Sequence, residues 1–240
     1  YLVDPSVEVF ERWQEQAGGR IVKSALAAER EGACPYCAAL AAMGVVTSIG
    51  HSDATYDQTL AAVNAGASCF VHTYNGQRGL HHRDPGVTGA AMTTKNTYAE
   101  IICDGRHVVP AAIKALVDAK GWEHTVLITD CLGCGGMPEG EYMSGGLPVV
   151  MKGGLCYLRN EDGTTGSIAG SVLTLAEGVK NMVDWQIVTA DQAIRMATEV
   201  AARSARVDDR FGLIYPGREA DMTVFNADMT LATTFVGGVE

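Results

Sequence analysis

The sequence lacks any long run of basic residues, and its 18 Lys and Arg are outnumbered by 28 Asp and Glu. The formal net charge at pH 7 is -10, so the overall field opposes a nucleic-acid backbone, and we expect no nucleic-acid partner. An anionic small molecule can still bind such a chain, but only through a few placed side chains.

Long hydrophobic runs and targeting segments are also missing. No apolar stretch approaches the roughly 20 residues of a membrane helix, and no signal peptide opens the chain, so we expect no membrane partner. The first residue is Tyr1 instead of Met, from which we expect the natural start to lie upstream. Seven cysteines, an odd number, do not form a disulfide framework, and reduced thiols in a cytoplasmic protein are the simplest interpretation.

Two Cys-x-x-Cys pairs, at residues 34–37 and 131–134, suggest two possible functions for the cysteines, a redox site and a zinc site. The first matches a thiol-disulfide redox motif, but the chain is too long and too rich in strand–helix units for the small fold that carries such motifs. Together the pairs leave a four-cysteine zinc site formally open, although they follow different strands. We favour Cys131 and Cys134 as small packing residues. No Walker loop or dinucleotide fingerprint occurs.

What the sequence does contain is an alternation of short apolar runs with helix-like runs between residues 20 and 130. Asp53 is the expected N-cap of a helix that stops near Gly66. We expect strands at 20–27, 45–50, 69–71, 98–103 and 125–129, and further helices at 35–43 and 110–120. This alternation predicts a parallel sheet with helical crossovers.

The second half is expected to differ in character. Residues 139–166 predict an excursion of hairpins, and helices follow at 171–183 and 190–205. The strand-like tail, 212–238, predicts a small β-layer. We therefore expect a barrel-type catalytic domain over residues 1–205 and a C-terminal β segment of a small β-sandwich domain over 206–240.

Four successive strands are followed closely by a histidine or an aspartate: His51, His72, Asp104 with His107, and Asp130. In a (β/α) barrel the carboxyl ends of the strands meet on the face that carries the chemistry. Two imidazoles there can share a divalent Zn or Fe ion, whereas a lone histidine is more often an ordinary hydrogen-bonding residue. Asp130 can act as a general base or acid, or alternatively as a helix cap.

Residues 72–86 are dense in side chains that bind oxyanions, including Arg78, His81, His82 and Arg83. The alternative is an ordinary solvent-exposed basic loop. A cluster of basic residues in an otherwise acidic chain, however, is stronger evidence for anion binding than it would be in a basic chain.

At this point the sequence resembles the N-acetylglucosamine-6-phosphate deacetylase family of amidohydrolases. The resemblance rests on ordered motifs: Gly-His-Ser-Asp-Ala-Thr at 50–55, His-Thr-Tyr-Asn at 72–75, Arg-Asp-Pro-Gly at 83–86, Ile-Ile-Cys-Asp-Gly-Arg-His at 101–107, Thr-Asp at 129–130, Ile-Ala-Gly-Ser-Val-Leu-Thr at 168–174, and a superfamily motif at 212–221. It implies a metal-dependent (β/α)8 TIM-type barrel that hydrolyses the acetamide of N-acetylglucosamine 6-phosphate, releasing glucosamine 6-phosphate and acetate.

The resemblance also implies roles for single residues. His51 and His72 bind a divalent metal, Zn or Fe, and Asp130 is the catalytic base and acid. Because the arginine at the position of Arg83 often reaches the neighbouring subunit's substrate, a homodimer is implied. The amino-sugar phosphate is held by Asn75, Gly76, Arg83 and His107, with Ile168, Ala169 and Gly170 along the sugar pocket.

The chain also departs from the family pattern. An upstream His-x-His segment and a Glu metal ligand in His-Leu-Glu-Gly-Pro do not occur, so the first two or three of eight barrel strands are expected to be missing. Glu29 corresponds to a later strand end and not to that ligand. Open strand edges promote aggregation, so we expect these 240 residues alone to be weakly active or inactive and poorly folded. Two alternatives are another amidohydrolase acting on a different or cyclic amide, and a metal-free binding protein derived from a barrel.

Overall fold

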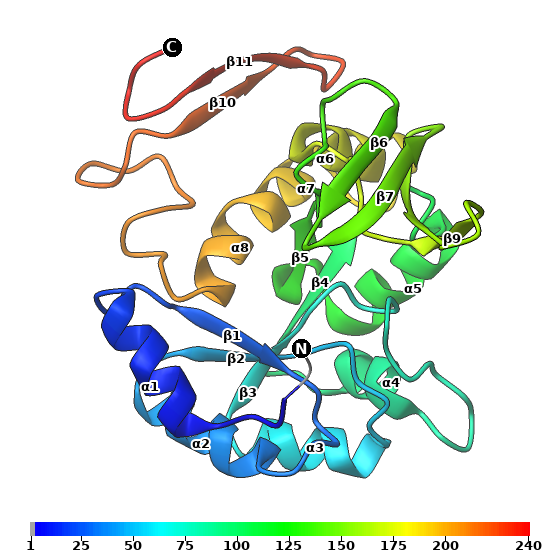
Figure 1. Ribbon diagram of the computed structural model, residues 1–240. Helices are drawn as coiled ribbons and strands as arrows, with labels where there is room; N and C mark the ends of the chain where they lie inside the picture. The colour runs from blue at the N-terminus through cyan, green and yellow to red at the C-terminus, as the bar shows by residue number, and fades with distance from the viewer. Residues whose placement is uncertain (1–2) are drawn as a thin grey trace.

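The computed structural model describes residues 3–240, and its central element is a parallel five-stranded sheet. Its strands lie side by side in chain order (Figure 1): β1 (Lys23–Leu26), β2 (Val46–Ile49), β3 (Ala67–Phe70), β4 (Tyr98–Ile102) and β5 (Thr125–Ile128). The helices of this half are α1 (Val7–Gln16), α2 (Ala33–Ala42), α3 (Tyr56–Asn64), α4 (Gly86–Thr93) and α5 (Pro110–Lys120). Five consecutive strands with helical connections are a segment of a (β/α) barrel, which confirms the predicted fold class.

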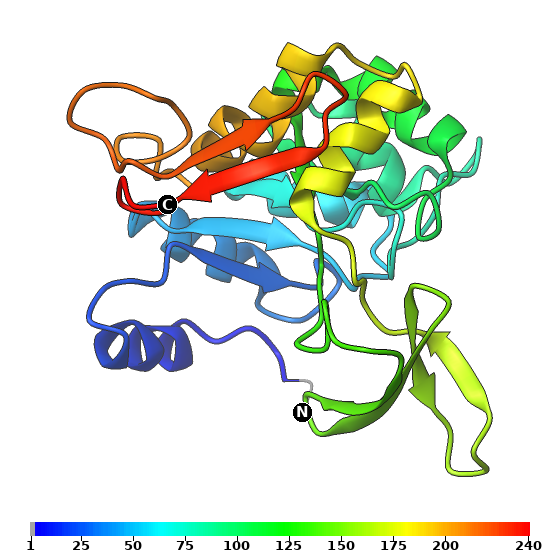
Figure 2. The ribbon, with the colours of Figure 1, turned by 90° about the horizontal axis from the view of Figure 1, so that it is seen from above.

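Two antiparallel sheets follow, as the turn-rich second half predicts. The hairpin sheet consists of β6 (Gly140–Ser144), β7 (Leu147–Lys152), β8 (Leu155–Arg159) and β9 (Thr165–Ile168), and it projects from the rest of the molecule (Figure 2). The tail forms a separate hairpin of β10 (Met222–Phe225) and β11 (Leu231–Phe235). Both β regions are confirmed, whereas the division into two domains at residue 205 stays a prediction.

Helix boundaries show where the sequence prediction was wrong. Helix α3 begins at Tyr56, because Thr55 forms a capping box with Gln58, so Asp53 is not the N-cap. Helix α6 (Leu175–Asp184) begins after Thr174, which forms a capping box with Glu177, and not at residue 171. In both helices the threonine hydroxyl accepts a hydrogen bond from the backbone amide three residues later. The Gln or Glu side chain at that later position accepts one from the backbone amide of the threonine, so two otherwise free amides are satisfied.

The expected helix over 190–205 is two helices. They are α7 (Ala190–Ala197) and α8 (Glu199–Ser204), and the break falls at Thr198, whose backbone has φ -123° and ψ -84°. Its hydroxyl donates to the carbonyl of Ile194. A short 3-10 helix (Trp122–His124) also precedes β5.

The hydrophobic core has three parts. Helices α1 to α4 pack on β1 to β3 around Phe10, Leu40 and Phe70, and the second part joins β4 and β5 to α5, α6 and α7 around Ile101 and Met182. The third part is small and lies between the hairpin sheet and the loop after β5. The strand ends of the large sheet are thus held by two continuous cores, while the hairpin sheet has little apolar support of its own.

The edge strand β1 has one side without a partner strand among the described residues. Only Leu26 of its four residues is buried, and the ammonium of Lys23 bonds the carboxylate of Glu100 on β4. A charged residue on an edge opposes pairing with other chains. The predicted aggregation of the isolated chain stays a prediction.

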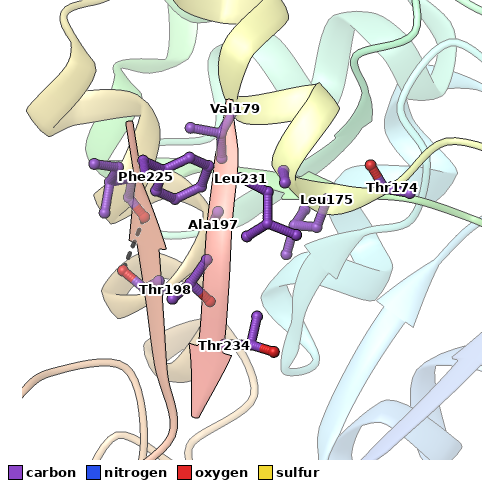
Figure 3. A pocket seen from close by; sticks show the side chains of 11 residues that line it. Thr174, Leu175, Val179, Ala197, Thr198, Phe225, Leu231 and Thr234 are labelled. Carbon is purple, nitrogen blue, oxygen red and sulfur yellow. Dashed lines mark hydrogen bonds between the residues drawn. The ribbon is translucent and has the colours of Figure 1, made fainter. Parts of the chain in front are cut away.

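An apolar pocket of about 280 Å³ lies between the tail hairpin and helices α6 and α7. Figure 3 shows Phe225 and Leu231 of the hairpin facing Val179 and Ala197 across it. It carries no cluster of ionisable groups and is lined by none of the residues predicted for the chemistry. Over residues 3–240, we find no helix long and apolar enough to cross a membrane.

Candidate active site at the carboxyl ends of the strands

Four polar residues occupy the same position relative to their strands. His51, His72, Asp104 and Asp130 are each the second residue after the last residue of β2, β3, β4 and β5, respectively. Carboxyl ends of neighbouring parallel strands lie at one edge of a sheet, so these side chains emerge on one face. The prediction that successive strands deliver histidine and aspartate to a common face is therefore supported by the strand register.

Three of these residues have a left-handed backbone. The φ angles are 47° at His51, 28° at His72 and 49° at Asp130. Residues other than glycine adopt this conformation at a cost of about 1–3 kcal/mol, and such residues gather at functional sites, where the surrounding structure enforces them. In this conformation the backbone turns sharply at each of the three residues, just after the strand that precedes it.

The two histidines are in direct contact. Nε2 of His51 lies 2.9 Å from Nε2 of His72, and the rings meet edge to face with centroids 4.6 Å apart. Burial lowers the pKa of His51, His72 lowers it further, and the charge of Asp130 partly opposes both effects. The neutral ring is favoured near pH 7, which leaves a lone pair available on this imidazole.

The backbone of Gly76 lies beside the His51 ring, and Glu29 holds the turn that carries it. The position of a β-carbon on Gly76, whose φ is +58°, would be 3.0 Å from Nδ1 of His51, so the backbone passes directly beside the ring. The hydroxyl of Ser52 donates to Glu29 at 2.6 Å, and the other Glu29 oxygen accepts from the amide of Asp53 at 2.9 Å. Glu29 thus fixes the turn that carries His51.

Gly50 allows β2 and β3 to approach each other just before the two histidines. A β-carbon at Gly50 would fall 1.8 Å from Cγ2 of Val71. We expect Gly50→Ala to lower the free energy of unfolding by about 1–3 kcal/mol, because the stiff valine cannot move aside. Denaturant unfolding measures this loss. Gly133→Ala is the matched control, since no atom lies within 4 Å of its added carbon, and equal stability of the two variants would contradict the prediction.

His107 is oriented by Asp104. Its Nδ1 lies 2.5 Å from the Asp104 carboxylate, which also accepts from the amides of Arg106 and His107. Burial alone would raise the pKa of Asp104, but these hydrogen bonds hold it below its usual value. Nε2 of His107 is buried without a partner among the described residues, as is Nδ1 of His72. A buried polar atom without a partner is costly, so both nitrogens are positioned for a ligand or a water molecule.

Asp130 lies against the segment predicted to line the sugar pocket. The amide of Ser171 donates to the carbonyl of Asp130 at 2.8 Å, and a β-carbon on Gly170 would be 3.1 Å from that carbonyl. Ala169 is held by a 3.0 Å hydrogen bond from its amide to the carbonyl of Cys156, and Ile168 is exposed. The structure thus brings Asp130 and residues 168–170 together.

Asn75 is held beside the histidine pair. Its amide donates to the carbonyl of His72 at 2.9 Å, and its Nδ2 lies 3.4 Å from the same carbonyl. Asn75 thus closes a turn with His72, and Gly76 follows directly after it.

The two arginines of the basic loop are placed differently. Arg78 lies beside His51 but bonds both oxygens of Asp53, at 3.0 and 3.1 Å, and Asp84 at 3.3 Å. It is neutralised by two carboxylates, so the expectation that it binds an oxyanion finds no support. Arg83 is exposed, and its Nη1 lies 2.7 Å from Nε2 of His82. Its side chain forms no hydrogen bond or ion pair with the histidine pair or with Asp130.

The histidine pair fits two positions of a divalent-ion site. Two nitrogens bound to one tetrahedral Zn at about 2.0–2.1 Å lie about 3.3 Å apart, so a small separation of the two rings from 2.9 Å would admit the ion. Within residues 3–240, however, no three His, Cys, Asp or Glu side chains are grouped to hold a metal ion. The cysteine pairs at 34–37 and 131–134 likewise form no zinc site in that part of the chain.

Sequence reasoning missed two residues of this site. Glu29 was compared with a family motif but not assigned a part in holding His51, and Asp104, although noted after its strand, was not assigned a part in orienting His107. The three-residue spacing of Asp104 and His107 was a usable signal. The contact of Glu29 with Ser52, 23 residues away, left no signal in the sequence.

Comparison with known proteins shows the family of the chain. Residues 5–240 match the amidohydrolase family. The chain belongs to that family. It is 41% identical over 233 residues to an N-acetylglucosamine-6-phosphate deacetylase of Vibrio furnissii, covering 97% of this chain and 57% of the relative. It is also 41% identical to an N-acetylgalactosamine-6-phosphate deacetylase of Escherichia coli O157:H7, covering 89% of this chain and 55% of the relative.

Solved structures give the same result for the fold. An N-acetyl-D-glucosamine-6-phosphate deacetylase mutant from Mycobacterium smegmatis, in complex with N-acetyl-D-glucosamine-6-phosphate, aligns with a TM-score of 0.91 at 31% identity. The alignment covers 99% of this chain and 62% of that one. This amidohydrolase chain therefore spans somewhat more than half the length of these three relatives.

Proposed function

We propose that this chain supplies the histidine pair, the catalytic aspartate and the sugar-binding segment of a deacetylase acting on N-acetylated hexosamine 6-phosphates, with N-acetylglucosamine 6-phosphate as the first candidate substrate. The observation that carries the proposal is the 2.9 Å contact of His51 and His72, close enough to Asp130 for its charge to act on His51. The deacetylases to which the chain is 33–41% identical support the substrate class.

Each group of residues at the site has a separate proposed role. His51 and His72 would hold a divalent ion, Zn or Fe, which when bound polarises a carbonyl and acidifies water. The carboxylate of Asp130 takes a proton from the attacking water and later delivers it to the nitrogen of the leaving amine. Residues 168–170 lie against Asp130 and would contact the sugar, while the free Nε2 of His107 would bind a hydroxyl or phosphate oxygen.

An assay of the purified protein tests the proposal. The metal-loaded protein is incubated with N-acetylglucosamine 6-phosphate, and acetate and primary amine are measured together. Equal release of both products is the expected result. A metal-loaded preparation that releases neither from any N-acetylhexosamine phosphate would contradict it.

A second candidate is the epimeric substrate, N-acetylgalactosamine 6-phosphate. It is favoured by the 41% identity to the E. coli O157:H7 enzyme and by 39% identity to a putative N-acetylgalactosamine-6-phosphate deacetylase of E. coli K12, of which the chain covers 97%. The two sugars differ only in the configuration at C4. The ratio of kcat/KM for the two substrates decides between them.

Arg83 is proposed to bind the phosphate across a homodimer interface of a cytoplasmic enzyme. Its exposure and lack of contact with its own site leave it available to a second subunit. We expect Arg83→Ala to raise KM for the phosphorylated sugar about 10-fold or more, with little effect on the unphosphorylated sugar, because a charge-assisted hydrogen bond is lost. The exposed Arg12→Ala on α1 is the control.

Mixing variants tests whether Arg83 acts in the partner's site. Arg83→Ala and Asp130→Asn subunits, once exchanged, form mixed dimers in which one site has both native residues. At a substrate concentration well below KM, where Arg83→Ala sites contribute little, about one quarter of the wild-type activity should return, since half of the dimers are mixed and each has one intact site. No recovery despite demonstrated subunit exchange would show that Arg83 acts within its own subunit or not at all.

A further inference from the structure

Two cysteines far apart in the sequence meet in the small third core. Cys134, in the turn after β5, and Cys156, on β8, have Sγ atoms 3.3 Å apart, and both side chains are buried. They lie among Met151, Leu132 and Tyr142. The other five thiols, all within the described part of the chain, make no recorded sulfur–sulfur contact.

We propose that Cys134 and Cys156 are a site of reversible disulfide formation that links the loop of Asp130 to the hairpin sheet. A disulfide requires an S–S distance of about 2.05 Å, so the two sulfurs need to close by about 1.2 Å. Side-chain rotation and a small shift of the turn can supply that movement, because the third core is small and the hairpin sheet projects from the main body (Figure 2).

The link would join segments that both touch the candidate site. Cys134 lies four residues after Asp130, and the carbonyl of Cys156 accepts the amide of Ala169 in the predicted sugar-binding segment. A covalent bond between them would restrict the movement of Asp130 relative to residues 168–170. The proposed redox pair thus joins Cys134 to a cysteine outside both Cys-x-x-Cys motifs, whereas the sequence favours Cys134 as a packing residue.

The chemistry is thiol–disulfide exchange with a small-molecule disulfide. One thiolate displaces one thiol of the reagent and forms a mixed disulfide, and the second thiolate displaces the other. Two electrons pass from the protein to the reagent, and the two thiol protons end on the two released thiols. Burial, together with Cys134, raises the pKa of Cys156 to about 12, so the reaction is expected to accelerate with rising pH.

Oxidation by cystamine, followed by mass spectrometry, tests the proposal. Trypsin cleavage after Lys and Arg places Cys131 and Cys134 in peptide 121–152 and Cys156 in peptide 153–159. After treatment of the native protein at pH 8.5, more than about half of these peptides should be linked, and dithiothreitol should separate them. Fragment ions should locate the bond at Cys134.

Two variants sharpen the test. Cys134→Ser should abolish the linked peptides, whereas Cys131→Ser, which alters an exposed thiol of the same loop, should retain them. Linked peptides joined through Cys131, linkage that persists in Cys134→Ser, or the absence of linkage in the wild-type protein would each overturn the proposal. The wild-type measurement decides even if a variant fails to fold.

Discussion

Replacing Asp130 by Asn should lower kcat for acetate release by about 10²–10⁴-fold while leaving the fold and the bound metal unchanged. The reason is that an amide cannot accept the proton of the attacking water. A loss of this size is typical when an enzyme loses its general base. Asparagine has nearly the same shape as aspartate and tolerates the left-handed backbone that residue 130 adopts, with φ 49°. Stopped assays of acetate, metal analysis and thermal unfolding measure the three quantities.

The matched control for this variant is Asp118→Asn. Asp118 is exposed on α5 and pairs with Lys114, so its replacement should leave kcat within about 2-fold of the wild type. Unchanged turnover in Asp130→Asn would remove the aspartate from the mechanism. A loss of metal in that variant would instead make Asp130 a ligand.

Replacing His72 by Ala should remove the bound metal and with it essentially all turnover. His72 supplies one of two imidazole nitrogens that face each other at 2.9 Å, and a single remaining histidine binds a divalent ion far more weakly. We expect metal content to fall from about one ion per chain to below about one tenth, and acetate release to fall by about 10³-fold or more.

His124→Ala is the control for the metal experiment. His124 precedes β5, at the opposite end of that strand from Asp130, and its ring lies beside Tyr98 with centroids 5.6 Å apart. Its loss should leave the metal content unchanged. Stoichiometric metal in His72→Ala would show that the ion is bound elsewhere, and equal losses in both variants would point to general unfolding.

Much of the architecture could be predicted because its causes are local. The expected helix at 110–120 was found with both bounds as predicted, since Pro110 opens it and Gly121 follows its last residue. The wrong starts predicted for α3 and α6 also have a local cause. Thr55 and Thr174 are the N-caps because they form capping boxes with Gln58 and Glu177.

The site was only partly predictable because it depends on contacts between distant segments. Spacing after the strands located His51, His72 and Asp130, and the motifs supplied Asn75, Gly76 and residues 168–170. The pairing of Arg78 with two carboxylates, which removes it as an anion binder, could not be seen. The roles of all these residues toward metal and substrate, and those of Arg83 and His107 toward the phosphate, remain predictions.

The sequence by itself determined the alternation of strands and helices, the order of the polar residues along it, and the family to which the chain belongs. These properties depend on apolar periodicity, capping residues and motif order, which act within a few residues. Only the tertiary structure decided that the Nε2 atoms of His51 and His72 meet and that Cys134 faces Cys156 instead of Cys131. Such contacts depend on strand register and on left-handed turns enforced by the surrounding packing, and no local preference encodes them.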